Sequence, residues 1–181
     1  MSLYAAFLRG MNVGGHRLTN AELCGHFTAM GFREVASFRA SGNVVFAGEE
    51  RSADVVSAQI EQGLEAALGY AVPTFVRSAG EVREIAAMQP FAREHVEAST
   101  GKLQVALLRS APSAKDRKQV LELASKQDRL LFGERELYWL PSGGLSDSEL
   151  DLKAIERHLG AITVRTKNTI EQIAGKHFAA G

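Results

Sequence analysis

The residues best suited to chemistry lie together near the N-terminus, after an apolar run that ends at Leu8. They are Arg9, Gly10, Asn12, Gly14, Gly15, His16 and Arg17. Glycine tolerates positive φ angles and lets a ligand approach the backbone closely. Backbone N–H groups at a helix start favour an anion, and the basic side chains add charge and donors. The stretch therefore predicts an anion-binding loop.

A helix start follows this loop. Thr19 is placed as an N-cap, and Glu22, three residues later, completes a capping box. The helix is expected between Leu18 and Met30, with Gly31 as its C-terminal stop. An apolar strand over residues 4–8 comes before the loop. The whole stretch is thus predicted as a strand, a glycine-rich loop and a helix.

The spacing of Gly10 and Gly15 resembles that of the phosphate loop of nucleotide hydrolases. That motif needs a lysine and a Ser or Thr hydroxyl, and His16 and Arg17 stand in those places. The G-x-G-x-x-G fingerprint of dinucleotide-binding proteins is absent. The sequence argues against nucleotide hydrolysis and leaves two interpretations: a general anion-binding loop, or glycines that only form the turn.

The sequence offers no assembled catalytic or metal site. The five histidines are His16, His26, His95, His158 and His177. None has metal-ligand spacing, so no metal is expected, and no cofactor is identified. Ser41 lacks the surroundings of a nucleophile and, like Asn43, is interpreted as a turn former. His16 lies beside the loop and could act as an acid or base, which leaves an enzyme of unknown reaction type open.

The composition is that of a globular protein of 181 residues, 45% apolar. Lys and Arg number 21, as do Asp and Glu, so there is no overall basic field for nucleic acid. Cys24 is the only cysteine and is expected in the core. No signal peptide or membrane-spanning run is present, so a cytoplasmic protein with no membrane partner is expected.

The predicted elements occur in the same order twice. The first series has strands at 4–8, 35–39, 44–46 and 73–77, with helices at 18–30 and 56–69. The second has strands at 103–108, 130–132, 137–140 and 162–165, with helices beginning near Ser113 and Ser146. A further helix follows each series, the first capped by Ser78 and Glu81, and residues 95–101 are expected as a connector.

This order predicts an α+β fold made by tandem duplication of a ferredoxin-like βαββαβ unit, each copy with an appended helix. The repeats are assigned to residues 1–98 and 99–181. Arg9, Arg109, Arg77 and Arg165 each end a strand in matching places. Either they share a cleft between the repeats, or they are solvated residues at strand ends.

A ferredoxin-like unit also raises the possibility of RNA or DNA binding through an open sheet face. Ser41–Phe46 has one aromatic residue where the RNA-binding pattern has several. The second hairpin contains Phe132, Tyr138 and Trp139, which core packing explains equally well.

Several motifs together resemble the bacterial family known as domain of unknown function 1697. They are Leu8-Arg-Gly-Met-Asn-Val-Gly-Gly15, Ser41-Gly-Asn-Val-Val-Phe46, Gln89-Pro-Phe91 and Thr163-Val-Arg-Thr-Lys-Asn-Thr169. The resemblance implies an α+β protein with repeated halves and no established activity. In the last motif, Thr166 and Lys167 replace the Asn and Trp that are usual in the family.

The leading hypothesis is a protein that binds a small anionic or nucleotide-like ligand through three of these segments. The predicted ligand-binding residues are Arg9, Gly10, Asn12, Gly14, Gly15, His16, Ser41, Gly42, Asn43, Arg165, Asn168 and Thr169. A nucleic-acid-binding module and an enzyme acting in the same cleft are the alternatives. The ligand and the oligomeric state are left open.

Overall fold

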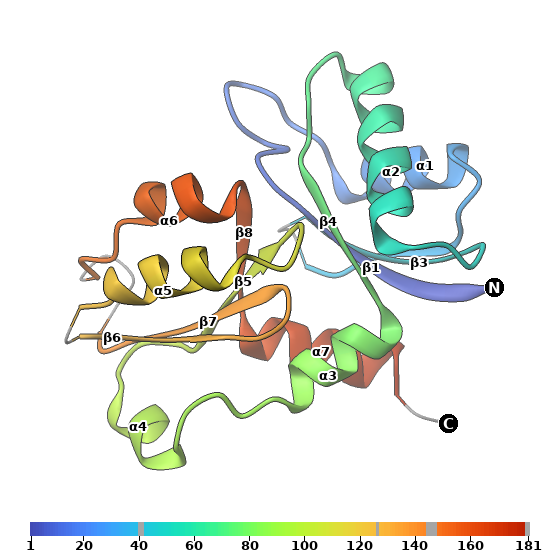
Figure 1. The fold of residues 1–181 in the computed structure, drawn as a ribbon. Helices are drawn as coiled ribbons and strands as arrows, with labels where there is room; N and C mark the ends of the chain where they lie inside the picture. Colours follow the sequence, from blue (N-terminus) through green and yellow to red (C-terminus); the bar gives the residue numbers. More distant parts are fainter. Residues whose placement is uncertain (40–41, 126, 144–147, 180–181) are drawn as a thin grey trace. The chain divides into compact units, whose positions relative to one another are not determined.

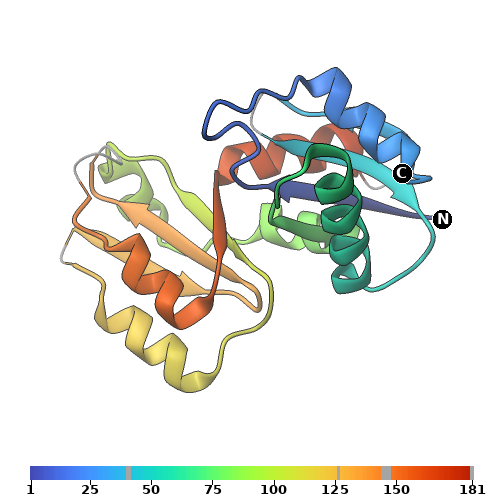
Figure 2. The same cartoon turned by 90° about the horizontal axis from the view of Figure 1, so that it is seen from above.

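A computed structural model describes residues 1–39, 42–125, 127–143 and 148–179 (Figures 1 and 2). The chain folds into two compact units. The first unit comprises Met1–Ile85 and Gln172–Gly181, and the second comprises Ala86–Glu171. The repeat boundary between residues 98 and 99 rests on similarity between the two halves of the sequence, whereas the two units are defined by their compactness in space. The boundary therefore stays a prediction. Within the described residues, no helix is long and apolar enough to cross a membrane.

The first unit is built on a four-stranded antiparallel sheet in the order β2-β3-β1-β4. Its elements are β1 (Ser2–Leu8), α1 (Asn20–Ala29), β2 (Arg33–Ser37), β3 (Asn43–Gly48), α2 (Ala53–Leu68), β4 (Thr74–Ser78) and α3 (Ala79–Ala87). The series β1 to β4 is the predicted βαββαβ unit, and α3 is its appended helix. β1 is a central strand, as its continuous apolar sequence indicates.

Alternation along β1 divides the side chains of the first unit between two faces of its sheet. Tyr4, Ala6 and Leu8 belong to a core cluster with residues of α1 and α2. Figure 1 shows both helices on this face. Phe27 of α1 and Ile60 of α2 are fully buried in the same cluster. The apolar sides of α1 and α2 therefore pack against the face of the sheet that contains Tyr4, Ala6 and Leu8.

The helix boundaries confirm the capping signals. The Thr19 side chain accepts a hydrogen bond from the Glu22 N–H, and the Glu22 carboxylate accepts one from the Thr19 N–H. Hydrogen bonds from the Thr19 N–H and the Thr19 hydroxyl to the Glu22 carboxylate lower the pKa of Glu22. Gly31 follows the end of α1 with φ +91°, and Gly69 ends α2 with φ +79°. Both angles lie in the left-handed region that glycine adopts readily.

The other face of this sheet includes Arg77, which is only 1% exposed. Its Nη1 donates to the Val76 carbonyl at 3.0 Å. The prediction of a solvated arginine is therefore wrong for Arg77. α3 and the end of the last helix cover this side (Figure 1), joined by a hydrogen bond from Arg83 to the Phe178 carbonyl.

The second unit has a sheet of the same topology, in the order β6-β7-β5-β8. Its elements are α4 (Arg93–Ala98), β5 (Gln104–Leu108), α5 (Ala114–Glu122), β6 (Asp128–Phe132), β7 (Glu136–Pro141), α6 (Leu152–Leu159) and β8 (Ile162–Thr166). α7 (Lys167–His177) begins in this unit and ends in the first. Figure 2 shows α5 and α6 together on one face of the sheet.

The two units agree in register as well as in order. Ala5 of β1 pairs with Arg77, and Val105 of β5 pairs with Arg165. The helices that follow these strands begin alike: Glu81 N–H donates to Ser78 Oγ at 3.3 Å, and Thr169 N–H to Thr166 Oγ1 at 3.2 Å. The tandem ferredoxin-like fold is confirmed.

Two details of the second unit differ from the prediction. The expected connector contains a helical turn, α4, which has no counterpart in the βαββαβ order. The predicted start of α6 near Ser146 is wrong, because Asp151 is the N-cap and accepts from the Ala154 N–H at 3.0 Å. Several residues between Ser146 and Asp151 are of types that cap helices, and their spacing alone does not show which one is the N-cap. Ser146 itself lies outside the described residues.

A buried carboxylate organises the core of the second unit. Asp128 is 3% exposed and accepts hydrogen bonds from Trp139 Nε1 at 2.6 Å and Ser148 Oγ at 2.9 Å. Ser125 Oγ donates to the other carboxylate oxygen at 2.8 Å. The network ties the start of β6 to β7 and to the segments around Ser125 and Ser148, since each donor comes from a different place in the chain.

We expect Asp128→Ala to destabilise the protein by roughly 2–4 kcal/mol, because it leaves the buried Trp139 N–H without its charged acceptor. Denaturant unfolding followed by the fluorescence of Trp139, the single tryptophan, measures this change. Glu122→Ala, at an exposed position near the end of α5, is the control and should stay within about 0.5 kcal/mol. Equal stability of the two variants would contradict the role of the network.

Candidate functional site

The glycine-rich loop, residues 9–19, is anchored at its base by three hydrogen bonds. Leu8 N–H donates to the Gly42 carbonyl at 2.8 Å, and Arg9 N–H donates to the Pro73 carbonyl at 2.9 Å. Tyr70 Oη donates to the Met11 carbonyl at 3.0 Å, and the Met11 side chain is buried. The loop therefore starts from a fixed position beside the β2–β3 hairpin and the start of β4.

Two polar side chains fix the rest of the loop. Asn12 Oδ1 accepts from the Leu18 N–H at 2.7 Å and so closes the loop before α1. The His16 ring stacks on the Tyr70 ring, with centroids 4.1 Å apart. These contacts give Asn12 and His16 a part in the shape of the loop, and ligand binding by either residue stays a prediction.

The glycines present backbone to the surface. Gly10, Gly14 and Gly15 have φ of +68°, +67° and +86° and are exposed. A Cβ at Gly14 or Gly15 would meet no atom within 4 Å. In the described part of the chain, the N–H groups of Gly14 and Gly15 have no hydrogen-bond acceptor. Left-handed residues in a turn can direct successive N–H groups outward, which suits an anion.

The tip of the β2–β3 hairpin lies against the base of the loop. Gly42 has φ +70°, and a Cβ there would come within 3.2 Å of the Leu8 carbonyl oxygen. Asn43 is 1% exposed, and its Nδ2 donates to the Phe38 carbonyl at 3.0 Å. The structure thus brings the first two predicted segments together and gives Gly42 and Asn43 structural contacts. Ser41 lies outside the described residues.

The site also involves residues that no pattern in the sequence marks. Tyr70 reaches the loop from the segment between α2 and β4. Asn20 Nδ2 donates to the Arg39 carbonyl at 3.1 Å and ties α1 to the hairpin. Arg39 has φ +57°, and its Nη2 donates to Gln172 Oε1 at 2.6 Å. Sequence reasoning misses such contacts because they join segments far apart in the chain.

The third predicted segment belongs to the second unit. Arg165 Nη1 donates to Thr163 Oγ1 at 2.8 Å and to the Val164 carbonyl at 2.9 Å. Burial lowers the pKa of Arg165 to about 10. Thr169 is buried at the start of α7, whereas Asn168 is exposed. That this third segment forms one site with the glycine-rich loop stays a prediction.

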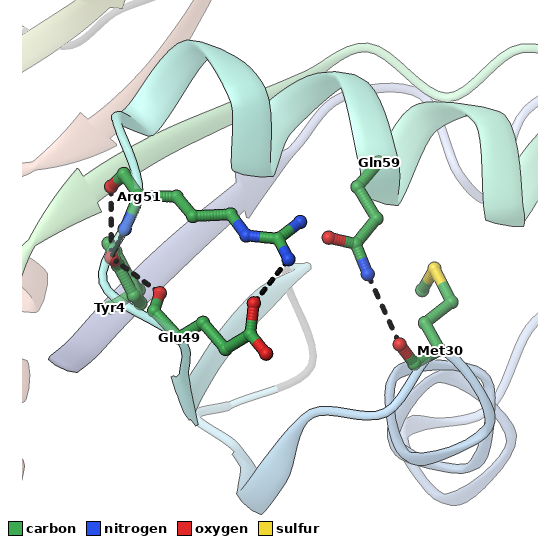
Figure 3. Close-up of polar contacts among 5 residues, drawn as sticks. All are labelled: Tyr4, Met30, Glu49, Arg51 and Gln59. Carbon is green, nitrogen blue, oxygen red and sulfur yellow. Dashed lines mark hydrogen bonds and ion pairs between the residues drawn. The ribbon is translucent and has the colours of Figure 1, made fainter. Parts of the chain in front are cut away.

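A separate hollow of about 220 Å³ lies between α1, the end of β3 and the start of α2. Gln59 Nε2 donates to the Met30 carbonyl at 3.2 Å on one side, and Arg51 pairs with the Glu49 carboxylate on the other (Figure 3). Tyr4 Oη holds the Arg51 backbone at 3.0 Å. The Glu49 carboxylate and the Arg51 guanidinium that line this hollow neutralise each other, so the hollow favours no charged ligand.

Metal binding finds no support in the described residues, which contain no group of three or more side chains able to hold an ion. Cys24, the single cysteine, is half-buried on α1.

A sequence model described as "Protein of unknown function (DUF1697)" matches residues 1–138. The chain belongs to the DUF1697 family. The match covers the glycine-rich loop, the first hairpin and α4. The family resemblance drawn from the sequence motifs is confirmed, and the family description assigns no activity.

The conserved bacterial protein SP0830 from Streptococcus pneumoniae has a similar structure, with a TM-score of 0.71 at 21% sequence identity. The similarity covers 97% of each chain. At this identity the likeness supports the fold alone. No curated protein matches the chain in sequence.

We expect Gly42→Ala to be more destabilising than Gly14→Ala. Both substitutions place a Cβ at positive φ, which costs ~1–2 kcal/mol. Only the Cβ at Gly42 meets the Leu8 backbone, at 3.2 Å, so its extra cost is expected to be about 1 kcal/mol or more. Thermal and denaturant unfolding of the two variants measure the difference. Equal free energies of unfolding would show that the hairpin tip accommodates the Cβ at Gly42 with no loss of stability, which would contradict the prediction.

Proposed function

We propose that the first unit binds a small anion, a phosphate or carboxylate group, at the glycine-rich loop. The observation that carries this proposal is the length of the loop. Eleven residues join β1 to α1, whereas five residues, Arg109–Ser113, make the equivalent connection between β5 and α5. The duplicated fold therefore does not need the longer loop, and extra loop length on a rigid scaffold commonly serves binding.

The charges around the loop support an anionic ligand. Arg9, His16 and Arg17 are exposed, and no acidic residue lies between Arg9 and Thr19. The next acidic residue, Glu22, is already engaged, since Thr19 donates to its carboxylate from N–H and Oγ1, both at 2.8 Å. Because this carboxylate occupies the start of α1, we place the ligand at the loop, beside the N–H groups of Gly14 and Gly15.

Arg165, Asn168 and Thr169 are kept as further candidate ligands within this proposal, and so is the cytoplasmic location expected from the sequence. Nucleotides are included among the ligands through their phosphate groups. An enzymatic role would use His16, whose ring is held by Tyr70.

Burial of the aromatic residues weighs against the nucleic-acid alternative. All thirteen Phe, Tyr and Trp residues lie in the described part of the chain, and none has an exposed side chain. Tyr138 and Trp139 of the second hairpin are 3% and 4% exposed. Binding of bases by stacking needs exposed aromatic rings on the sheet. A small anion therefore explains the loop better than an oligonucleotide does.

Titration with inorganic phosphate at constant ionic strength, followed by amide NMR, tests the proposal. We expect saturable shifts of the amides of residues 10–17. In the double variant Arg9→Gln, Arg17→Gln, affinity should fall by roughly tenfold, as expected for loss of charge-assisted hydrogen bonds. Arg33→Gln, at an exposed position in β2, is a control for loss of positive charge outside the loop and should leave affinity unchanged.

Two results would overturn the proposal. One is a set of loop shifts that does not saturate or that chloride reproduces at equal ionic strength. The other is binding of a short single-stranded oligonucleotide with no response to phosphate, pyrophosphate or acetate, which would favour the nucleic-acid alternative.

A further inference from the structure

A second hollow, of about 180 Å³, lies in the second unit between α4 and the ends of β6 and β7. We call it the α4 hollow. The side chains used in the argument are His95, Ser99, Gln127, Arg129, Leu140 and Ser142, all of which line it. It shares no residue with the glycine-rich loop, and none of its residues belongs to the site predicted from the sequence.

One wall of the α4 hollow is held firmly. Ser99 Oγ donates to the Pro141 carbonyl and accepts from the Gly101 N–H at 3.1 Å. A Cβ at Gly101 would lie 2.3 Å from the Gly143 carbonyl oxygen, so only glycine fits this approach. The chain after α4 is thereby fixed against the end of β7.

The register of the sheet supplies the opposite wall. Arg129 of β6 pairs with Leu140 of β7. Leu130 and Trp139 belong to the core beneath α5 and α6. Because side chains alternate along a strand, Arg129 and Leu140 point to the other face, where α4 lies. The position of Arg129 in the hollow therefore follows from the same alternation that buries Trp139.

The charge of the lining has one sign. Arg129 and His95 are its ionisable residues, and no carboxylate of the described residues lines the hollow. The neighbouring acid Asp128 is buried and accepts from Trp139, Ser148 and Ser125. Glu97 of α4 pairs with Arg93. The Ser142 hydroxyl and the Gln127 amide add neutral donors beside these cationic or protonatable groups.

We infer that the α4 hollow is a second anion-binding site, which takes a small oxyanion such as phosphate or a carboxylate. Arg129 supplies a planar guanidinium suited to two oxygens of the ligand. His95 of α4 and Ser142, which follows β7, supply further donors, and Leu140 adds an apolar contact. The volume suits a small anion, because sites for drug-sized ligands occupy ~300–1,000 Å³. This inference goes beyond the proposed function and does not depend on it.

Amide NMR titration of the full chain with inorganic phosphate, with ionic strength held constant by sodium chloride, tests the inference. We expect saturable shifts of the amides of Ser99, Gly101, Ser142 and Gly143. Arg129→Gln should weaken binding by roughly tenfold, and His95→Gln should weaken it measurably. Arg157→Gln removes an exposed charge of α6, which lies on the other face of the sheet, and should change nothing.

The variants separate this site from the loop. Arg9→Gln with Arg17→Gln should leave the α4 hollow unaffected, so failure of the proposed function and failure of this inference give different spectra. Unchanged spectra of the remaining residues show that each variant is folded. Shifts that do not saturate, that chloride alone produces, or that keep the same phosphate affinity in Arg129→Gln would overturn the inference.

Discussion

The close pairing of the Leu8 N–H with the Gly42 carbonyl is the contact on which the candidate site depends. It places the hairpin tip against the last residue of a central strand, at the point where the glycine-rich loop begins. A Cβ at Gly42 would crowd the Leu8 carbonyl oxygen, which lies 3.2 Å away. The base of the loop is thus anchored by backbone groups, while the Arg9 and Arg17 side chains are exposed, where a ligand can reach them.

Buried charge is the second constraint on the fold. Arg77 and Arg165 occupy matching places on the outer strands of the two sheets, yet Arg77 is almost completely buried. A buried guanidinium is stable only when its donors are satisfied, and the Val76 and Val164 carbonyls accept from the two residues. Burial also lowers the pKa of Arg165, which at about 10 still leaves it charged at neutral pH. The set of arginines at strand ends therefore contains both solvated and structural members.

Local signals in the sequence carried most of the fold. The caps at Thr19 and Ser113, the stops at Gly31 and Gly69 and the apolar run of the first strand are all short-range features, and the structure confirms them. Contacts between residues far apart in the chain could not be predicted from the sequence. The stack of Tyr70 on His16, the register that directs Arg129 away from the core and the helix α4 depend on tertiary packing. The sequence identified the loop as a candidate site but not the α4 hollow, whose residues are ordinary one by one.

Comparison of the repeats explains where binding is to be sought. The two units share strand order, register and helix caps, so these features serve the fold. Each unit also has one segment outside that shared plan: the long loop after β1 in the first and α4 before β5 in the second. Both segments are fixed by close backbone contacts at a glycine, Gly42 in one case and Gly101 in the other. The long loop carries basic side chains of its own, whereas α4 contributes His95 to a hollow whose guanidinium, Arg129, comes from β6. The duplicated fold forms twice from the shared elements alone. The segments that differ between the two copies are therefore not needed for the fold, and binding is to be sought there.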